Sequence, residues 1–503
     1  MHTVTAERER RQAGAAVLRR IWRLHFWVGL FAAPTLIVLA CTGLIILYSQ
    51  PLDLWLHRDL TVVTPGSSQV TLDDQVDTAR TNVAPDAVLD AVTPPEAADR
   101  STRVDFLPAA DSGVGERNVT QVFIDPYTGR YLGQRRELDG LVGWANQLHR
   151  FFGNDGPTLA LPSLGHLIAP SAYPDATVSV GIGNLIVEVT AVWILVLLAS
   201  GIYLWWPRPI EAAKPRLAIR WRKRGRLRWR DLHATTGILL SVVLIGYIVS
   251  GLTWSRYWGE NWRAVAETLT PAASVEAAST PAELGDYDRL GRRIPWADKT
   301  DPVYASNAAG GLPRPLGLAD IDAIAKSEDM IPGYSIMPPA DSSAGGETVY
   351  GSYTVVNRWP QKLSEQRTLY LDQFTGQTLA DATAAQDGAL SRMTSWSVDM
   401  HMGTQYGVLT RIIATLACLG LLTSIATAAI MWWKRRPSGG AGLPDRSSET
   451  ARTATPRGSA IAVAGTATVL AVVYPAFGAS LVIVLVAEAL VAARCRLRTI
   501  MEP

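Results

Sequence analysis

Four long apolar runs dominate the pattern of hydrophobic and polar positions along this chain of 503 residues. Residues 24–48 and 412–433 contain no charged residue, residues 238–254 are equally free of charge, and residues 181–206 carry only Glu188. Each run is about long enough to cross roughly 30 Å of hydrocarbon as a helix. A further apolar stretch is interrupted at "YPAFGAS". The pattern predicts a polytopic α-helical membrane protein with four core helices and a C-terminal helical hairpin.

Charge alternates along the chain in step with these runs. Six Arg precede Leu24, and residues 208–230 contain ten Lys or Arg against one Glu. Residues 50–180, by contrast, contain nine Lys or Arg and seventeen Asp or Glu. By the positive-inside rule, the basic segments face the cytoplasm and the two long polar segments lie outside. The formal net charge of +2 gives no general field for a polyanion, so we expect no nucleic-acid partner and only membrane lipid around the helices.

These two patterns together divide the chain into ten segments. They are a cytoplasmic N-terminus (1–23), a first span (24–49), a first outer domain (50–180), a second span (181–206), a basic cytoplasmic loop (207–232), a third span (233–254), a second outer domain (255–404), a fourth span (405–433), a cytoplasmic linker (434–458) and the terminal hairpin (459–494). The three cysteines form no CxxC or CxxCH motif, so the sequence suggests neither a disulfide framework nor covalently attached haem.

The second half of the chain repeats the first. His25 is followed by Gly29 and by "TG" at 42–43, and His233 is followed by Gly237 and by "SG" at 250–251, all at one offset of 208. In each outer segment a strand, a turn with Gly and another strand are predicted by "VFIDPYTGRYLG" and "LYLDQFTGQTLA", and helices by "TLDDQVDTARTNV" and "GLADIDAIAKSED". We therefore expect a tandem parallel repeat with two outer α+β domains, related by an axis along the membrane normal.

Only four of the seven histidines take part in this repeat: His25, His149, His233 and His401. The axis pairs His25 with His233 near the cytoplasmic face, and His149 with His401 near the outer face. Two imidazoles that face each other are what a six-coordinate haem iron needs. Gly29 and Gly237 lie on the same helical faces as the inner histidines and leave room for a flat macrocycle. The pattern predicts two haem b groups and an electron path across the membrane.

Several alternatives remain open at this point. The four histidines can instead be interfacial residues, with glycine present for helix packing. Zinc fits less well, because no acidic or cysteine partner recurs beside them. Glu188 and Arg411 lie inside the outer ends of their spans, so Arg411 can pair with a haem propionate, or the two can neutralise each other or reach the interface. His166 has no counterpart in the repeat, and we assign it no role.

As a set, several motifs resemble the PepSY-associated transmembrane proteins, a family described as iron-regulated or iron-uptake membrane proteins. The motifs are "LHFWVGL", "CTGLIILYSQ", "GIYLWWPR", "DLHATTGILL", "SGLTWSRYWG", "HMGTQYG" and "MWWKRRP". The resemblance implies that both outer domains are PepSY domains. It also implies that some members are haem proteins of the inner membrane that reduce ferric siderophores on the periplasmic side, with ligand roles at the four repeated histidines. Residues 153–180, which join the outer-face His149 to the second span, form a longer link than is usual in this family.

The expected function is therefore a dihaem b-type reductase of ferric siderophores, a haem-dependent oxidoreductase. No GxGxxG motif follows a predicted strand, so we expect the electron donor to be a quinol or a redox protein. A non-enzymatic membrane sensor or scaffold, with PepSY domains that bind a peptide or a protein partner, needs no haem. A siderophore transporter is the third alternative, although few polar groups interrupt the apolar cores.

Overall fold

The computed structural model places most of the chain. The structure describes residues 2–108, 119–153, 156–206, 217, 219–221, 225–271, 304–306, 314–344, 347–357, 362–436, 457–486 and 490. Most of the predicted linker at 434–458, and residues 207–216 of the predicted basic loop, lie outside this part of the chain.

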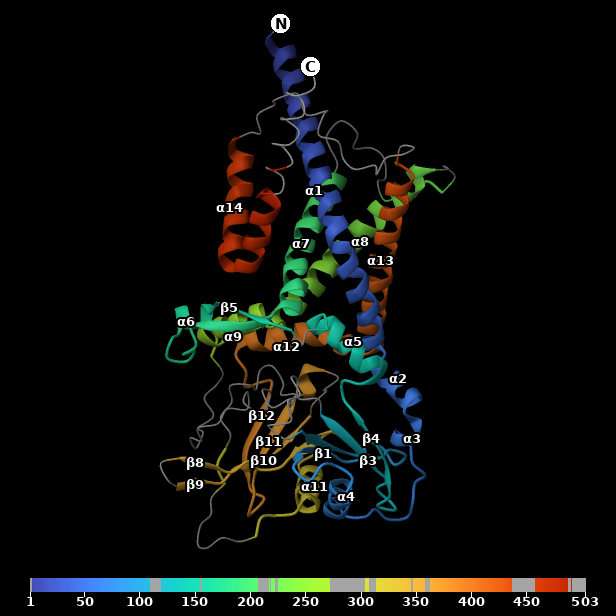
Figure 1. Cartoon of the computed structure of the whole chain (residues 1–503), viewed down its shortest axis with the longest axis vertical. Coiled ribbons are helices and arrows are strands. Elements are labelled where there is room, and N and C mark those ends of the chain that lie inside the picture. The colour runs from blue at the N-terminus through green and yellow to red at the C-terminus, as the bar shows by residue number, and fades with distance from the viewer. Residues whose placement is uncertain are drawn as a thin grey trace.

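Four helices are long and apolar enough to cross a membrane, as the sequence predicted. They are α1 (His2–Leu47, with its candidate span at Val17–Leu47), α7 (Ile182–Trp205), α8 (Arg226–Thr253) and α13 (Val408–Trp433). They run side by side as one bundle (Figure 1). Side chains from all four meet in its core, namely Ala32, Leu36, Ile194, Leu198, Ile248, Leu421 and Ile425.

The predicted C-terminal hairpin is also present. Helix α14 (Arg457–Val473) is followed by a second apolar helix, Pro475–Val486. Tyr474 and Phe477 are buried at the break between them, and the Phe477 ring lies 5.0 Å from the ring of Trp193 on α7. The indole N–H of Trp193 donates to the hydroxyl of Ser480 at 3.0 Å. The ring of Tyr474 also lies 5.6 Å from that of Tyr257, so the hairpin packs on α7 and on the residue that begins the next outer helix, outside the four-helix core.

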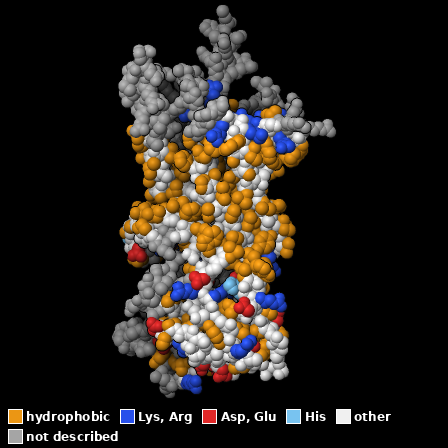
Figure 2. All heavy atoms as spheres, turned by 45° about the vertical axis from the view of Figure 1, so that its right-hand side comes forward, with side chains coloured by type: hydrophobic (Ala, Val, Ile, Leu, Met, Phe, Trp, Pro, Cys, Tyr) orange, Lys and Arg blue, Asp and Glu red, His pale blue; other side chains and the backbone are white. Residues whose placement is uncertain are grey.

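Apolar side chains form a broad band around the bundle, and Lys and Arg gather at its end away from the sheet (Figure 2). At the other end lies a layer of short elements: α5 (Gly140–Phe151), β5 (Thr158–Pro162), α6 (Leu164–Ile168), β6 (Thr177–Gly181), α9 (Tyr257–Leu269) and α12 (Ala389–Met402). Exposed apolar side chains such as Trp144, Leu167 and Leu269 are typical of a layer in contact with headgroups. The long link at 153–180 forms part of this layer, because β5 pairs with β6.

The outer part of the protein is built on one eight-stranded antiparallel sheet, in the order β12-β11-β10-β7-β1-β2-β3-β4. The strands are β1 (Val88–Thr93), β2 (Thr102–Leu107), β3 (Thr120–Ile124), β4 (Tyr131–Arg136), β7 (Ser335–Met337), β10 (Ser352–Val356), β11 (Arg367–Asp372) and β12 (Thr378–Thr383). A small separate ribbon pairs β8 (Ser342–Ala344) with β9 (Glu347–Val349).

Each half of the chain contributes four strands to this sheet, and the halves join where Val92 of β1 pairs with Ile336 of β7. The sequence predicted two outer domains, and the structure joins them. The reason is that each half alone would leave one more strand edge unpaired. The predicted strand pairs are found as β3 with β4 and β11 with β12, with positive φ at Gly129 and Gly376 in their turns.

The two predicted outer helices are α4 (Leu72–Arg80) and α11 (Leu318–Ser327), and they pack side by side on one face of the sheet. Their apolar faces bury Val76 and Ile321 against alternate strand residues such as Val104, Phe106 and Leu369. This core crosses the junction between the halves, so the two halves are expected to unfold together.

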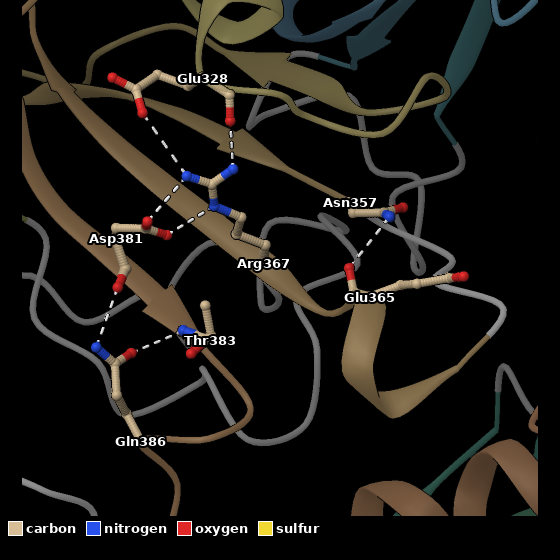
Figure 3. A network of polar contacts seen from close by, with 7 residues as sticks. All are labelled: Glu328, Asn357, Glu365, Arg367, Asp381, Thr383 and Gln386. Carbon is tan, nitrogen blue, oxygen red and sulfur yellow. Dashed lines mark hydrogen bonds and ion pairs between the residues drawn. The ribbon is translucent and has the colours of Figure 1, made fainter.

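At each edge of the sheet, an arginine side chain holds the outermost strand in place. Arg367 on β11 makes two hydrogen bonds of 2.9 Å to Asp381 on β12 and also donates to the carbonyl of Glu328 (Figure 3). On the opposite side, Arg135 of β4 binds both carboxylate oxygens of Asp53 at 3.1 Å. Asp53 lies on α2 (Ser49–Leu56), which follows α1 directly and leads into α3 (Arg58–Thr61). This pair therefore ties the sheet to the first membrane helix.

Replacing Asp73 with alanine should destabilise the outer sheet. Residue 317, before α11, is a glycine with no capping side chain, and the Asp73 carboxylate of α4 accepts instead from the N–H groups of Leu318 (2.9 Å) and Ala319 (3.0 Å). Loss of such a cap costs about 1 kcal/mol of unfolding free energy. Thermal unfolding in detergent should show a lower Tm for Asp73→Ala. The exposed Asp77 on the same helix is the control, and equal Tm values for Asp73→Ala and Asp77→Ala would contradict this role.

Candidate functional site

The four repeated histidines lie in two pairs inside the membrane bundle and at its outer end. The ring centroids of His25 on α1 and His233 on α8 are 6.2 Å apart, with the ring planes at 82°. The ring centroids of His149 on α5 and His401 on α12 are 6.3 Å apart, with the planes at 74°. The structure therefore brings together the same partners that the repeat suggested.

In the inner pair, one ring nitrogen of each histidine is held by a neighbouring membrane helix. Nδ1 of His25 lies 3.1 Å from the carbonyl oxygen of Leu197 and 3.0 Å from the hydroxyl of Ser200, both on α7. Nδ1 of His233 lies 3.0 Å from the carbonyl oxygen of Ser424 on α13. Partners of this kind fix the ring orientation of a metal-binding histidine.

The outer pair is held in the same way, by the helices that carry the inner histidines. Nδ1 of His149 lies 3.0 Å from the hydroxyl of Thr42 on α1, and Nδ1 of His401 lies 3.0 Å from the hydroxyl of Ser250 on α8. This contact explains why "TG" and "SG" recur at the offset of 208 in the sequence. The hydroxyl of each motif binds an outer histidine.

The hydrogen bonds also decide which nitrogen can bind a metal. The hydroxyl of Thr42 donates to the carbonyl of Val38 at 2.7 Å, and the hydroxyl of Ser250 donates to the carbonyl of Gly246 at 2.8 Å, so each hydroxyl accepts from the histidine that it contacts. Nδ1 of both outer histidines therefore carries the proton, and Nε2 keeps its lone pair for a ligand bond. Burial, with the neighbouring His401, lowers the pKa of His149 to about 4, and burial lowers the pKa of His401 as well. Both shifts favour the neutral imidazole, which is the form that binds metal ions.

Glycines make room for three of the four rings. A Cβ atom added at Gly201 would lie 3.1 Å from Cε1 of His25, one at Gly43 would lie 3.2 Å from Cε1 of His149, and one at Gly251 would lie 3.0 Å from Cε1 of His401. These separations are tighter than ordinary van der Waals contact, so any larger residue at these positions would displace the imidazole.

Both histidine pairs line a single cavity of about 2100 Å³ that runs through the bundle. Pockets for one small ligand are usually about 300–1,000 Å³, so this volume is enough for two large ligands. Gly29 and Gly237, which the sequence singled out, both line the cavity. A Cβ at Gly237 would meet no atom within 4 Å, and one at Gly29 would meet Leu197 at 3.6 Å. A side chain at Gly237 would point into open space that a ligand could use, whereas a side chain at Gly29 would contact Leu197.

The spacing within each pair fits one metal ion between two imidazoles. With metal–nitrogen bonds of about 2 Å, and about 1.2 Å from each nitrogen to its ring centre, the two centroids would be about 6.4 Å apart. The observed values are 6.2 and 6.3 Å. Among the described residues, no group of three or more His, Cys, Asp or Glu side chains could hold a metal ion. Two imidazoles alone would need a metal ion whose other ligands come from a bound group, such as a macrocycle.

The two pairs are separated by most of the membrane thickness. Thr42 follows His25 by 17 residues on α1, and Ser250 follows His233 by 17 residues on α8. At 1.5 Å per residue, the outer pair is about 26 Å along the bundle from the inner pair. This distance is close to the roughly 30 Å of a hydrocarbon core, so one pair lies near each face.

The other residues singled out in the sequence lie elsewhere. Glu188 is buried, and its carboxylate accepts from the N–H groups of Tyr257 (2.9 Å) and Trp258 (3.2 Å) at the start of α9. The carboxylate of Glu188 therefore caps the start of α9, rather than pairing with Arg411 as one alternative from the sequence had it. Arg411 lies near the outer end of α13 and is not among the residues that line the cavity, whereas Arg150 is. Nδ1 of His166, on the short α6, lies 2.9 Å from the carbonyl oxygen of Tyr173.

Sequence reasoning missed the residues that orient the rings. No local sequence pattern marks Ser200, Gly201 and Ser424, because the histidines that they contact lie on other helices. The signal for Thr42 and Ser250 was present in the repeat, but its meaning depended on contacts with residues 107 and 151 positions away.

Comparison with known proteins identifies the family of the chain. A search of curated proteins finds no match for the chain. The family model of the PepSY-associated TM region matches residues 22–435, a stretch that holds most of the first candidate span, the other three membrane helices, both histidine pairs and the outer sheet. Since this match covers well over half of the chain, the protein is a membrane protein that belongs to the PepSY-associated transmembrane family.

Proposed function

We propose that this protein is a dihaem b-type reductase of the bacterial cytoplasmic (inner) membrane, which passes electrons across the membrane to reduce a ferric siderophore. The observation that carries the proposal is the geometry of the two histidine pairs, with ring centroids 6.2 and 6.3 Å apart in one cavity. His25 with His233, and His149 with His401, would each hold one haem b. The chemistry that haem b supplies when bound is one-electron transfer.

The proposed direction rests on charge. The end of the bundle where Lys and Arg gather (Figure 2) would face the cytoplasm, and the sheet would face outward. With an even number of spans, both chain termini would then be cytoplasmic. Electrons from a quinol or a redox protein would enter near His25 and His233 and leave near His149 and His401. A ferric chelate at the outer face would gain one electron, and its hard oxygen ligands would then hold the ferrous ion less tightly.

The relation between the halves supports the same proposal. The strand order of the sheet mirrors itself about the contact of β1 with β7, and the four histidines occupy matching places in the two halves. We propose that the chain is a parallel tandem repeat with a pseudo-two-fold axis along the membrane normal. Such an axis would place each iron between equivalent residues of the two halves.

An optical spectrum of the detergent-purified protein tests this function first. Oxidised and dithionite-reduced spectra, with a pyridine haemochrome assay, should show two low-spin haem b groups per chain. The reduced protein, mixed anaerobically with a ferric siderophore, should be reoxidised while ferrous iron appears in a colorimetric trap. No haem after expression with adequate haem supply would favour a non-enzymatic sensor or scaffold, and siderophore uptake by vesicles without haem would favour a transporter.

Replacing Gly251 with alanine should impair the outer site. The new Cβ would lie 3.0 Å from Cε1 of His401 and would push the ring from its place beside Ser250. We expect partial loss of one haem per chain and a changed low-spin electron paramagnetic resonance signal from the outer site alone. Both are measured on the purified protein.

Gly246 on the same helix is the matched control for this change. A Cβ there would meet nothing within 4 Å, so Gly246→Ala should keep both haems and stabilise the helix by up to about 1 kcal/mol. The role of Gly251 is wrong if the two variants have the same haem content and spectra.

A further inference from the structure

Each of the four membrane helices carries a hydroxyl residue followed by a small residue, at a place where the hydroxyl meets one histidine of another helix. The dipeptides are Thr42-Gly43 on α1, Ser200-Gly201 on α7, Ser250-Gly251 on α8 and Thr427-Ala428 on α13. In the same order, the hydroxyls contact His149, His25, His401 and His233. All four rings of the two pairs therefore meet the same kind of dipeptide.

The hydroxyl of each dipeptide accepts a hydrogen bond from its ring. Its own hydrogen is used within its helix, where it donates to a backbone carbonyl three or four residues earlier at 2.7–2.8 Å. The hydroxyl oxygen lies 3.0 Å from Nδ1 of the histidine in three of the dipeptides and 3.4 Å in the case of Thr427. The imidazole therefore donates from Nδ1, and Nε2 is left for a ligand bond.

The small residue of the dipeptide sets the place of the neighbouring ring atom. A Cβ atom added at Gly43, Gly201 or Gly251 would lie 3.2, 3.1 or 3.0 Å from Cε1 of the ring that the adjacent hydroxyl contacts. Cε1 is bonded to Nδ1, so each of these dipeptides touches two adjacent atoms of one imidazole. A hydrogen bond and a close backbone contact along one edge oppose rotation of the ring.

The rings held in this way cross each other within each pair. Their planes stand at 82° in the inner pair and at 74° in the outer pair. The two rings of a pair are held from different helices, which are α7 and α13 for the inner pair and α1 and α8 for the outer pair. The angle between the planes is therefore set by the packing of the membrane helices.

We propose that the four dipeptides are ring clamps, which hold the two axial imidazoles of each haem crossed and unable to turn. Their members are positioning residues, because they touch the ligand rings and not the iron. This inference rests on the proposed function. A ring that cannot turn keeps its geometry when the iron changes oxidation state, so little reorganisation accompanies each electron transfer.

Crossed imidazoles have a spectroscopic signature in a low-spin ferric haem. Each ring donates π density to the iron d orbital that lies perpendicular to the plane of that ring. Parallel rings raise the same orbital, whereas crossed rings raise two different orbitals and leave them nearly equal in energy. The electron paramagnetic resonance (EPR) signal is then strongly anisotropic, with one very large g value. Any turn away from a right angle separates the orbitals and lowers that g value.

The test records EPR spectra of the oxidised full-length protein with one intact histidine pair at a time. His233→Ala leaves the outer pair and His401→Ala leaves the inner pair, and each should show a low-spin signal with one very large g value. Adding Thr42→Val and Ser250→Ala to His233→Ala removes both outer hydroxyls. We expect the largest g value of the outer site to fall, because both rings can then turn. If this variant loses its haem, Ser250→Ala alone, which releases one ring, is measured in its place.

The controls separate the clamp from a general effect on the fold. Thr42→Val and Ser250→Ala in the His401→Ala protein should leave the inner signal as it is, because both hydroxyls lie at the other site. Thr42→Ser with Ser250→Thr keeps both hydroxyls and should keep the large g value. Thr423→Val changes an exposed threonine of α13 in the same way as Thr42→Val and should alter neither signal.

The inner clamps should respond more weakly to the same kind of change. Nδ1 of His25 also lies 3.1 Å from the carbonyl oxygen of Leu197, and Nδ1 of His233 lies 3.0 Å from that of Ser424. These acceptors remain when the inner hydroxyls are removed by Ser200→Ala and Thr427→Val. The largest g value of the inner site should therefore fall less than that of the outer site.

The possible results separate the two proposals. Low-spin haem without a very large g value in protein with all four dipeptides overturns the inference and leaves the proposed function standing. A large g value that persists at the outer site without the two hydroxyls, or that falls equally in Thr423→Val, does the same. Absence of low-spin haem from both sites overturns both proposals.

Discussion

Replacing His233 with alanine should lower the haem b content from two groups to one per chain and stop electrons from entering at the cytoplasmic face. His233 supplies one of the two imidazoles of the inner pair, and its Nδ1 is fixed by the carbonyl of Ser424 at 3.0 Å. Alanine offers no nitrogen, and no other His, Cys, Asp or Glu cluster among the described residues replaces it. The pyridine haemochrome assay counts the loss.

The intact outer site of this variant allows the two half-reactions to be measured separately. In His233→Ala the outer pair is intact, so chemically reduced protein should still be reoxidised by a ferric siderophore, while a quinol should no longer reduce it. His166→Ala is the control, because that ring binds the carbonyl of Tyr173 in the layer outside the bundle and does not line the cavity. An unchanged haem count in His233→Ala would refute the assignment of the inner site.

Replacing His401 with alanine should give the opposite result. The outer haem should be lost and the inner one retained, because His401 and His149 lie about 26 Å along the bundle from the inner pair. The quinol should still reduce the remaining haem, but reoxidation by the ferric siderophore should be abolished, because the proposed function places iron reduction at the outer pair. Stopped-flow absorbance with each partner separates the two half-reactions.

The pair of variants has a combined prediction. If each site conducts on its own side, no mixture of His233→Ala and His401→Ala protein restores quinol-driven iron reduction, because the two sites must lie in one chain. Reoxidation of His401→Ala at the rate of the unchanged protein would show that the outer pair is not the exit of the electron path. It would then move the site of iron reduction away from the sheet.

The membrane helices could be predicted from the sequence because the requirements of the bilayer apply to each span by itself. Each span must satisfy its own backbone hydrogen bonds and present apolar side chains over about 20 residues. The apolar runs therefore matched α1, α7, α8 and α13, and the break at "YPAFGAS" matched the turn of the hairpin. The outer strands and helices were also predicted, since turn glycines such as Gly129 and alternating residues are local signals.

The joining of the two outer domains into one sheet could not be predicted from local sequence signals. Pairing of β1 with β7 joins residues more than 240 positions apart, through the single register Val92 with Ile336. Strands pair through backbone hydrogen bonds, which depend little on the type of side chain. A sequence pattern therefore seldom identifies the partner of an edge strand.

The sequence by itself determined the spans, their alternating charge, and four histidines in matched places of a repeat. Only the tertiary structure decided that opposed rings lie 6.2 and 6.3 Å apart, that Thr42 and Ser250 hold the outer rings, and that Arg150 rather than Arg411 lines the cavity. The physical reason is that residue types follow from local requirements of the membrane, whereas ring orientation and cavity lining follow from contacts between helices that are distant in the chain.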